Sequence, residues 1–159
     1  MAAARYLEDF AVGETFETGS ARVELAESVA FARRNDPQDF HIDPERARSH
    51  PLFRGLAVSG FFTMTLVHRL ILAEEIGHAW GLVGKGITEM RWKRPVRPGD
   101  TIRVRGLVLD VAPEPGQPFG ILRTALEAVN QEDKTVMTLV VDAVVPTRAA
   151  LAEGVREAA

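Results

Sequence analysis

The sequence of 159 residues contains no cysteine, one tyrosine and two tryptophans. The absence of cysteine excludes a disulfide framework, thiolate catalysis and metal centres that depend on cysteine ligands. The sequence also lacks a run of about 18 uninterrupted apolar residues, so a transmembrane helix is not expected. Its first residues show no basic stretch followed by an apolar run, as a secretory signal would. These features predict a cytoplasmic protein without a membrane partner.

An excess of one charge is lacking too, since 22 acidic residues face 19 basic ones and the formal net charge is −3. This balance, and the scarcity of aromatic residues near the basic ones, argues against a nucleic-acid partner. A chain of this length most simply forms one domain, with a core that needs no metal or disulfide. We expect that domain at residues 1–146 and a C-terminal tail or short helix at 147–159.

The pattern of apolar residues predicts two helices followed by strands. An amphipathic helix is expected at 25–34, and a helix that is apolar on most sides, and therefore buried, at 58–76. A long connection with three prolines, 35–57, separates them. Alternation of apolar and polar residues predicts strands at 15–18, 88–93, 102–111, 122–128 and 137–145. A phase change at Gly106 suggests a β-bulge. This order predicts an α+β fold in which an antiparallel sheet packs on a central helix.

The candidate chemistry lies in the segment between the two helices. Asp36 and His41 are five residues apart, on either side of Pro37 and its neighbours. A loop can turn a carboxylate and an imidazole toward one point, where they form a general acid–base pair at neutral pH. Two alternatives stay open at this point. In the first, the polar side chains only tether the loop backbone. In the second, His41 and Asp43 share a metal ion whose other ligands the sequence does not name.

Gly60 lies at the start of the predicted buried helix. Backbone N–H groups at a helix start lack partners and the helix dipole is positive there, so this end could hold an oxyanion. In the alternative interpretation, the glycine only permits close packing of helix and sheet, and Ser59 is the helix N-cap.

Four short motifs together resemble the MaoC-like hydratases and dehydratases, which include the (R)-specific enoyl-CoA hydratases. They are DxxxFHxDP at 36–44, FxG at 53–55, AxxG at 57–60 and RPVRPGD at 94–100. The resemblance runs from about residue 8 to residue 146.

The resemblance implies a hot-dog fold, in which the sheet wraps around a long central helix and two copies form a homodimer or a higher homo-oligomer. It implies the reversible hydration of a 2-enoyl thioester of coenzyme A, or of acyl carrier protein, to the (R)-3-hydroxyacyl thioester. No metal or further cofactor is needed. Asp36 and His41 match the catalytic pair, and we favour Asp36 as the group that deprotonates water, with His41 as partner acid. Gly60 matches the glycine whose N–H binds the thioester carbonyl oxygen.

The sequence departs from the family pattern at three positions. Gln38 and Asp39 stand where Asn-Pro is common, and Ser59 stands where many members have His. Ser59 can donate a hydrogen bond, and we expect it to contact the substrate. Several basic residues near the turn are expected to meet the phosphates of coenzyme A, the alternative being a solvated sheet face. They are Arg91, Lys93, Arg94 and Arg97.

Two other functions remain open. A thioesterase on the same fold would need a carboxylate or another base on the central helix, and residues 59–66 contain no Asp or Glu. A non-catalytic acyl-CoA-binding or dimerisation module would bind coenzyme A without turnover and would be indifferent to Asp36→Asn. The length and type of the acyl chain are left open.

Overall fold

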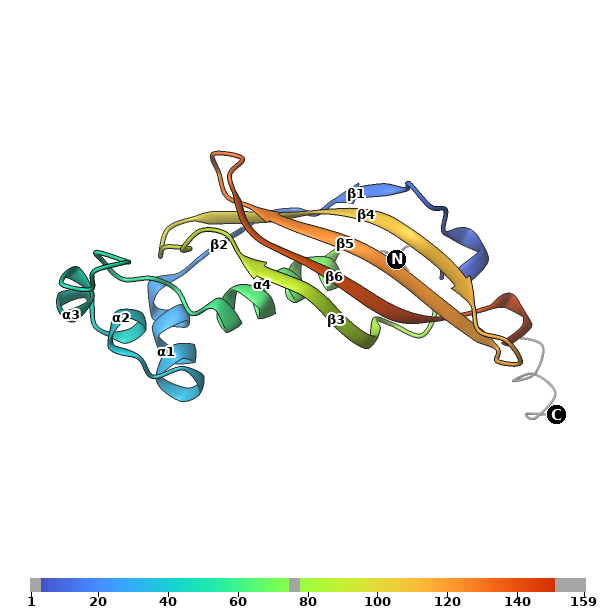
Figure 1. The fold of residues 1–159 in the computed structure, drawn as a ribbon, viewed down its shortest axis with the longest axis horizontal. Coiled ribbons are helices and arrows are strands. Elements are labelled where there is room, and N and C mark those ends of the chain that lie inside the picture. The colour runs from blue at the N-terminus through green and yellow to red at the C-terminus, as the bar shows by residue number, and fades with distance from the viewer. Residues whose placement is uncertain (1–3, 75–77, 151–159) are drawn as a thin grey trace.

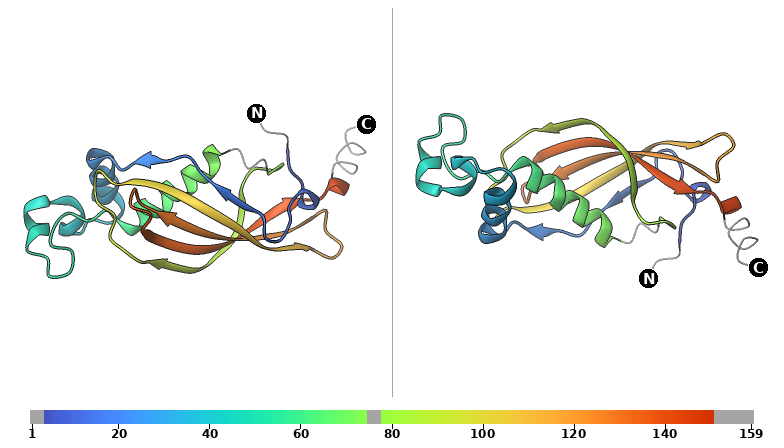
Figure 2. Two further views of the ribbon diagram at one scale, coloured as in Figure 1. Left: turned by 90° about the horizontal axis from the view of Figure 1, so that it is seen from above. Right: turned by 90° about the horizontal axis from the view of Figure 1, so that it is seen from below.

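The computed structural model describes residues 4–74 and 78–150. A helix, α4 (Gly60–Ala73), lies across the concave face of an antiparallel sheet (Figures 1 and 2). The long strands are β3 (Val83–Trp92), β4 (Thr101–Pro113), β5 (Phe119–Val129) and β6 (Thr135–Pro146). Two short strands, β1 (Thr15–Glu17) and β2 (Ala21–Arg22), pair with β4. The order β1-β4-β5-β6-β3 around one helix is the predicted α+β hot-dog arrangement, and it confirms that expectation.

The core lies between α4 and the inner face of the sheet. Phe62, Leu66 and Leu70 recur every four residues along α4 and are buried, because this spacing puts them on one helix face. They pack in one cluster with Ile102 of β4 and Met137 of β6. Burial of each such side chain contributes roughly 1.5–3 kcal/mol. The core therefore fixes the axis of α4 against the sheet, and with it the position of the helix start.

Three further helices lie beyond one end of the sheet (Figure 1). They are α1 (Leu25–Asn35), α2 (Asp39–Ile42) and α3 (Pro44–Arg48). The Asp43 carboxylate accepts the N–H groups of Glu45 and Arg46, so it caps α3, which begins at a proline as expected. The expectation of one long connection at 35–57 was wrong in part, since α2 and α3 lie within it. Helices of four and five residues are too short to show an apolar period.

The expected bulge at Gly106 was wrong. Gly106 pairs in register with Leu126, and the register shift lies between Val108 and Asp110. A Cβ atom on Gly106 would lie 2.1 Å from the ring of Phe16. The glycine therefore serves close packing of this ring on β4, which the sequence pattern does not distinguish from a bulge.

The ends of two predicted elements fall partly outside the described residues. The buried helix was expected to reach residue 76, and α4 ends at Ala73, while 75–77 are not described. At the C-terminal end, the Ala150 N–H donates to the Thr147 carbonyl at 3.1 Å, and 151–159 are not described. The tail or short helix at 147–159 therefore stays a prediction. Within residues 4–74 and 78–150, no helix is long and apolar enough to cross a membrane.

Candidate active site

The first turn of α4 borders a hollow of about 540 Å³. The end of α1, helix α2, the segment before α4 and the end of β3 complete its wall. Asp36, His41 and Gly60 line this hollow together. The chain between α1 and α4 folds back over the start of α4, so residues that are distant in the sequence meet at one point.

His41 lies on α2, and a hydrogen bond to the backbone of Ala57 holds its imidazole. Its ring is 7% exposed, and Nδ1 lies 2.7 Å from the Ala57 carbonyl oxygen. Because a carbonyl oxygen only accepts, Nδ1 carries the proton of this hydrogen bond. Nε2 faces Asp36, 3.3 Å from its Oδ2. The rings of Phe40 and Phe53 pack beside the imidazole. Nε2 is therefore the nitrogen that can exchange a proton in the hollow.

Asp36 follows the last turn of α1, where its N–H donates to the Ala32 carbonyl at 2.8 Å. Oδ1 accepts a hydrogen bond from Gln38 Nε2 at 2.7 Å, and Oδ2 accepts one from Ser59 Oγ at 2.7 Å. Burial acts to raise the pKa of Asp36, but the hydrogen bonds from Gln38 and Ser59 and the charge of His41 lower it overall. Asp36 is therefore a carboxylate at neutral pH and can accept a proton.

Ser59 joins this carboxylate to the start of α4. Its Oγ donates to Asp36 and accepts the Phe61 N–H at 3.3 Å, so one hydroxyl serves as helix cap and as donor to the carboxylate. Its side chain is fully buried, with 0% exposed. A role in positioning Asp36 fits these surroundings better than the expected contact with substrate.

Gly60 is the first residue of α4. Among the described residues, no group accepts a hydrogen bond from the Gly60 N–H. The preceding carbonyl, of Ser59, accepts the Thr63 N–H at 3.0 Å and the Thr63 hydroxyl at 3.3 Å. An N–H that lies free at a helix start, where the dipole is positive, can hold the oxygen of a carbonyl that gains negative charge.

Trp92, the last residue of β3, also lies in this hollow, which the sequence reasoning missed. Its Nε1 donates to the Gly60 carbonyl at 3.1 Å, and the Phe61 ring meets it edge-on with centroids 5.9 Å apart. In the sequence, Trp92 suggests only core or edge packing. A signal exists in retrospect, because a glycine at a helix start can make room for a bulky neighbour.

Two of the expected phosphate-binding residues line the hollow, Lys93 and Arg94. Arg94 donates from Nη1 to the Thr135 carbonyl at 2.7 Å, which holds it near the end of β6. Arg91 lies outside the lining and donates to its neighbour, the Met90 carbonyl, at 3.0 Å. Lys93 and Arg94 thus lie where a charged substrate group could reach, and Arg91 does not.

Arg97 makes backbone contacts that the sequence did not predict. Its guanidinium donates to three backbone carbonyls in the segment before α4, those of Phe53, Gly55 and Leu56. The backbone N–H of Arg97 donates to the Asp100 carboxylate at 2.8 Å. Three of its N–H donors are thus engaged with backbone, and the expected contact of Arg97 with phosphate stays a prediction. Arg97 therefore fixes the segment before α4, and the ring of Phe53 in that segment packs beside the His41 imidazole.

The structure offers no metal centre in the part of the chain that it describes. Across residues 4–74 and 78–150, no three His, Asp or Glu side chains gather as ligands would. Asp43, considered beside His41 for this role, uses its carboxylate to cap α3. Asp39, the unusual carboxylate in the motif, pairs with Arg46 at 3.0 Å.

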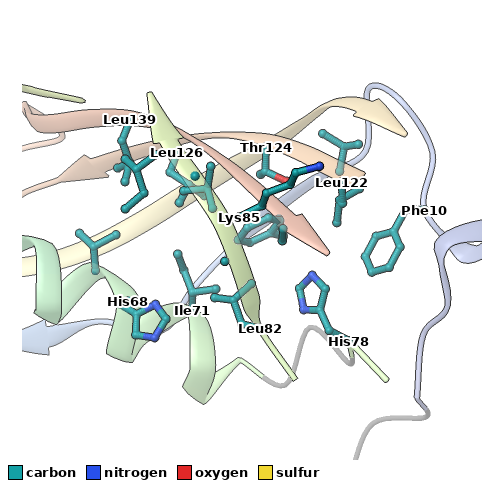
Figure 3. A pocket seen from close by; sticks show the side chains of 18 of the residues that line it. Phe10, His68, Ile71, His78, Leu82, Lys85, Leu122, Thr124, Leu126 and Leu139 are labelled. Atoms are coloured by element: carbon teal, nitrogen blue, oxygen red, sulfur yellow. The ribbon is translucent and has the colours of Figure 1, made fainter. Parts of the chain in front are cut away.

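A second cavity, of about 350 Å³, lies between α4 and the sheet (Figure 3). Met64, Val67 and Ile71 line it from α4, and they follow Gly60 at helical spacing on the same helix face. Its opposite wall is the apolar inner face of the sheet, with Leu122, Leu126 and Leu139. Met64 is four residues from Gly60, so this cavity begins about 6 Å along the helix axis from the free N–H.

Polar side chains border this cavity at a few points only. They include His68, His78, Lys85 and Thr124 (Figure 3). Burial, and then the charge of Arg5, lower the pKa of His78, so this imidazole is neutral at neutral pH. The cavity is therefore mainly an apolar chamber, suited to a hydrocarbon chain.

Comparisons with known proteins identify the family of this chain. The family described as MaoC like domain matches residues 9–138. A MaoC-like dehydratase from Rhodospirillum rubrum is 38% identical, with a TM-score of 0.86 over 91% of this chain and 99% of the other. An (R)-hydratase from A. caviae, described as involved in PHA biosynthesis, is 25% identical, with a TM-score of 0.67 over 88% and 98%.

A curated relative is similar over most of its length. It is the uncharacterized protein YdeM of Bacillus subtilis (strain 168), 32% identical over 130 residues, which are 82% of this chain and 91% of the relative. The chain therefore belongs to the family of MaoC-like domains.

Proposed function

We propose that this protein catalyses the reversible addition of water to a 2-enoyl-CoA, which gives the (R)-3-hydroxyacyl-CoA. One observation carries the proposal. Asp36 Oδ2 and His41 Nε2 lie 3.3 Å apart in a hollow that also holds the free N–H of Gly60. An acid–base pair beside an oxyanion donor is what addition to a thioester-activated double bond requires. The similarity to a MaoC-like dehydratase and to an (R)-hydratase supports it.

The pair divides the proton transfers of the reaction. In hydration, the Asp36 carboxylate takes a proton from water while the water oxygen forms its bond to C3. The electron pair of the double bond moves toward the thioester carbonyl, and protonated His41 delivers the Nε2 proton to C2. The proton that Asp36 took from water then passes to His41 Nε2, 3.3 Å away, which restores the initial protonation of the pair. Dehydration runs through the same steps in reverse.

Gly60 acts where charge develops. As the double bond electrons move, the carbonyl oxygen becomes an enolate oxygen, and its hydrogen bond with the Gly60 N–H strengthens. A contact that is stronger in the transition state than in the bound substrate accelerates the reaction. Loss of one such donor typically costs about 10²–10³ in kcat.

The remaining substrate contacts follow from the walls of the two cavities. We place the acyl chain in the apolar chamber beside α4, beyond Met64, and the charged part of coenzyme A near Lys93 and Arg94. A thioester of acyl carrier protein would place its phosphopantetheine phosphate in the same region. The basic side chains support this assignment because phosphates pair well with them.

We also propose that two copies associate as a homodimer. Strand β3 is at one edge of the sheet, and its apolar residues Val83 and Ile87 are 43% and 50% exposed. A long, exposed edge strand that carries apolar side chains is a surface that a second chain can cover. Sedimentation equilibrium should give about twice the mass of one 17.4 kDa chain, and a mass of one chain would contradict the proposal.

The hydration of crotonyl-CoA, followed as loss of enoyl-thioester absorbance, tests the function directly. Asp36→Asn and His41→Ala should each lower kcat by roughly a hundredfold or more. Asp39→Asn is the matched control, since this exposed carboxylate is three residues away and pairs with Arg46. It should keep near-wild-type kcat.

The other outcomes decide between the alternatives. Release of free coenzyme A would indicate a thioesterase. Binding of coenzyme A without turnover of crotonyl-CoA or of longer 2-enoyl-CoAs would indicate a binding module. Full activity of both site variants would show that Asp36 and His41 are structural.

A further inference from the structure

Trp92 lies against the glycine that we propose as the oxyanion donor. It comes from the end of β3, and its indole Nε1 donates to the Gly60 carbonyl at 3.1 Å. Its side chain is 48% exposed, so the ring covers Gly60 on one side and borders the hollow on the other. The tryptophan is thus both a wall of the site and a partner of its backbone.

Gly60 needs such a partner because glycine restrains its own backbone least of all residues. The peptide on its N-terminal side is held at the Ser59 carbonyl, which accepts from Thr63. The peptide on its C-terminal side, at the helix start, is held at the Gly60 carbonyl by Trp92. The Gly60 N–H lies in the first of these two peptide planes, and Trp92 restrains the second, which meets the first at the Gly60 Cα.

The ring of Trp92 also accounts for the glycine itself. A Cβ atom at position 60 would lie 2.5 Å from Trp92 Nε1 and 2.6 Å from Trp92 Cε2. These atoms belong to a rigid ring, so any side chain at position 60 would displace the indole or the helix start. Gly60 and Trp92 are therefore a matched pair.

We propose that Trp92 is a positioning residue for catalysis, which holds the Gly60–Phe61 peptide and, through the shared Gly60 Cα, keeps the neighbouring Gly60 N–H directed at the thioester carbonyl oxygen. This inference rests on the proposed function. It assigns to Trp92 an effect that acts through Gly60 and not through the proton transfers of Asp36 and His41. Since the Gly60 contact strengthens as the enolate forms, a misdirected N–H lowers kcat more than it weakens substrate binding.

Replacement of each tryptophan by phenylalanine tests the inference with a matched control. Trp92→Phe removes the indole N–H and keeps most of the ring, so the protein should fold as before. It should lower kcat about tenfold and leave KM within about twofold, because a donor is misdirected and not removed. Trp80→Phe replaces the other tryptophan, which is exposed and lies outside the hollow, and should keep wild-type kcat. An unchanged kcat in Trp92→Phe, or a rise in KM with kcat unchanged, would overturn the inference.

A double-mutant cycle tests the contact between the two residues. Gly60→Ala should lower kcat by about 10²-fold, because the new methyl group displaces the peptide from its place beside the indole. Trp92→Ala should lower kcat in the wild-type background but raise it in the Gly60→Ala background, where it makes room for the methyl group. Effects that simply multiply would show that the two residues act separately.

The proposed function and the inference fail in different ways. If the wild-type protein hydrates none of the 2-enoyl-CoAs, from crotonyl-CoA to longer chains, the proposed function is wrong and the inference falls with it. If the wild type is active, Asp36→Asn is inactive and Trp92→Phe is unchanged, only the inference is wrong.

Discussion

At the scale of single residues, the site depends on hydrogen bonds that are invisible in the sequence. Asp36 has two polar donors, Gln38 and Ser59, besides the imidazole of His41. These donors keep the carboxylate ionised although burial opposes its charge. Ser59 contributes twice, because the same hydroxyl caps the helix whose first N–H we assign to the oxyanion. A change at Ser59 should therefore be seen in the pH dependence of the reaction.

Ser59→Ala should shift the acid limb of kcat/KM to higher pH. The proposed base works as a carboxylate, so activity is lost as the pH falls through the pKa of Asp36, which lies below its usual value in the folded protein. Removal of the Ser59 hydrogen bond, one of the contacts that lower it, raises that pKa. The acid limb therefore moves upward, which is measured from pH profiles of crotonyl-CoA hydration. Ser59→Thr keeps a hydroxyl and should keep the wild-type profile, and an unmoved limb in Ser59→Ala would contradict the assignment.

The sequence could predict the pair but not its supports. The spacing of Asp36 and His41 across a proline allows a meeting point in a loop, and the structure shows them 3.3 Å apart. The partners that orient them, Ser59 and Ala57, are set by how the loop folds back over α4. Trp92 reaches the site from β3, after the whole of α4, and no local pattern encodes that contact.

At the scale of elements, the segments with a helical or alternating pattern were predictable, and so was the short strand β1, whereas α2, α3 and the start of β3 were not. The strands β4, β5 and β6 have one buried face and show it as alternation. Strand β3 begins at Val83, five residues before the predicted start, because both its faces are largely exposed and alternation is absent there. The helices α2 and α3 are too short for a period, and they are held by a cap and by tertiary contacts.

The side chain of Arg97 makes three hydrogen bonds with the backbone of the segment before α4. Arg97→Ala leaves the carbonyls of Phe53, Gly55 and Leu56 without their donor. Lost hydrogen bonds to a charged group cost about 1.5–3 kcal/mol of unfolding free energy. We expect a loss in this range from urea denaturation. Arg91→Ala is the control, because this exposed side chain meets only its neighbouring carbonyl, and it should change stability by less than about 0.5 kcal/mol. Equal stability of Arg97→Ala and the wild type would show that this guanidinium does not hold the segment.

At the scale of the whole molecule, the fold joins the two cavities through one helix. The hollow with Asp36 and His41 lies at the start of α4. The apolar chamber, which Figure 3 shows, lies farther along the same helix. The sequence predicts this helix and its burial, but the chamber arises from the curvature of the sheet and the course of β3 over it. Its volume therefore could not be read from residue patterns, and neither could the acyl chain.

The position of the chamber predicts which residue limits the length of the acyl chain that the protein accepts. Met64 lies about 6 Å along the helix from Gly60, at the near end of the chamber. Met64→Phe puts a rigid ring where a flexible side chain now stands, so it should block chains that extend past this point and spare short ones. We expect kcat/KM for a ten-carbon 2-enoyl-CoA to fall about tenfold relative to crotonyl-CoA, since several buried methylenes lose their place.

The control for this change lies one residue farther along the helix. Thr65 is exposed and does not line the chamber, so Thr65→Phe adds the same ring to the same helix on its outer side. It should leave the ratio of the two substrates unchanged. An equal fall for both substrates in Met64→Phe would indicate damage to the helix start and not a blocked chamber. An unchanged ratio in Met64→Phe would show that the acyl chain takes another route, because the new ring would block any chain that enters the chamber at its near end.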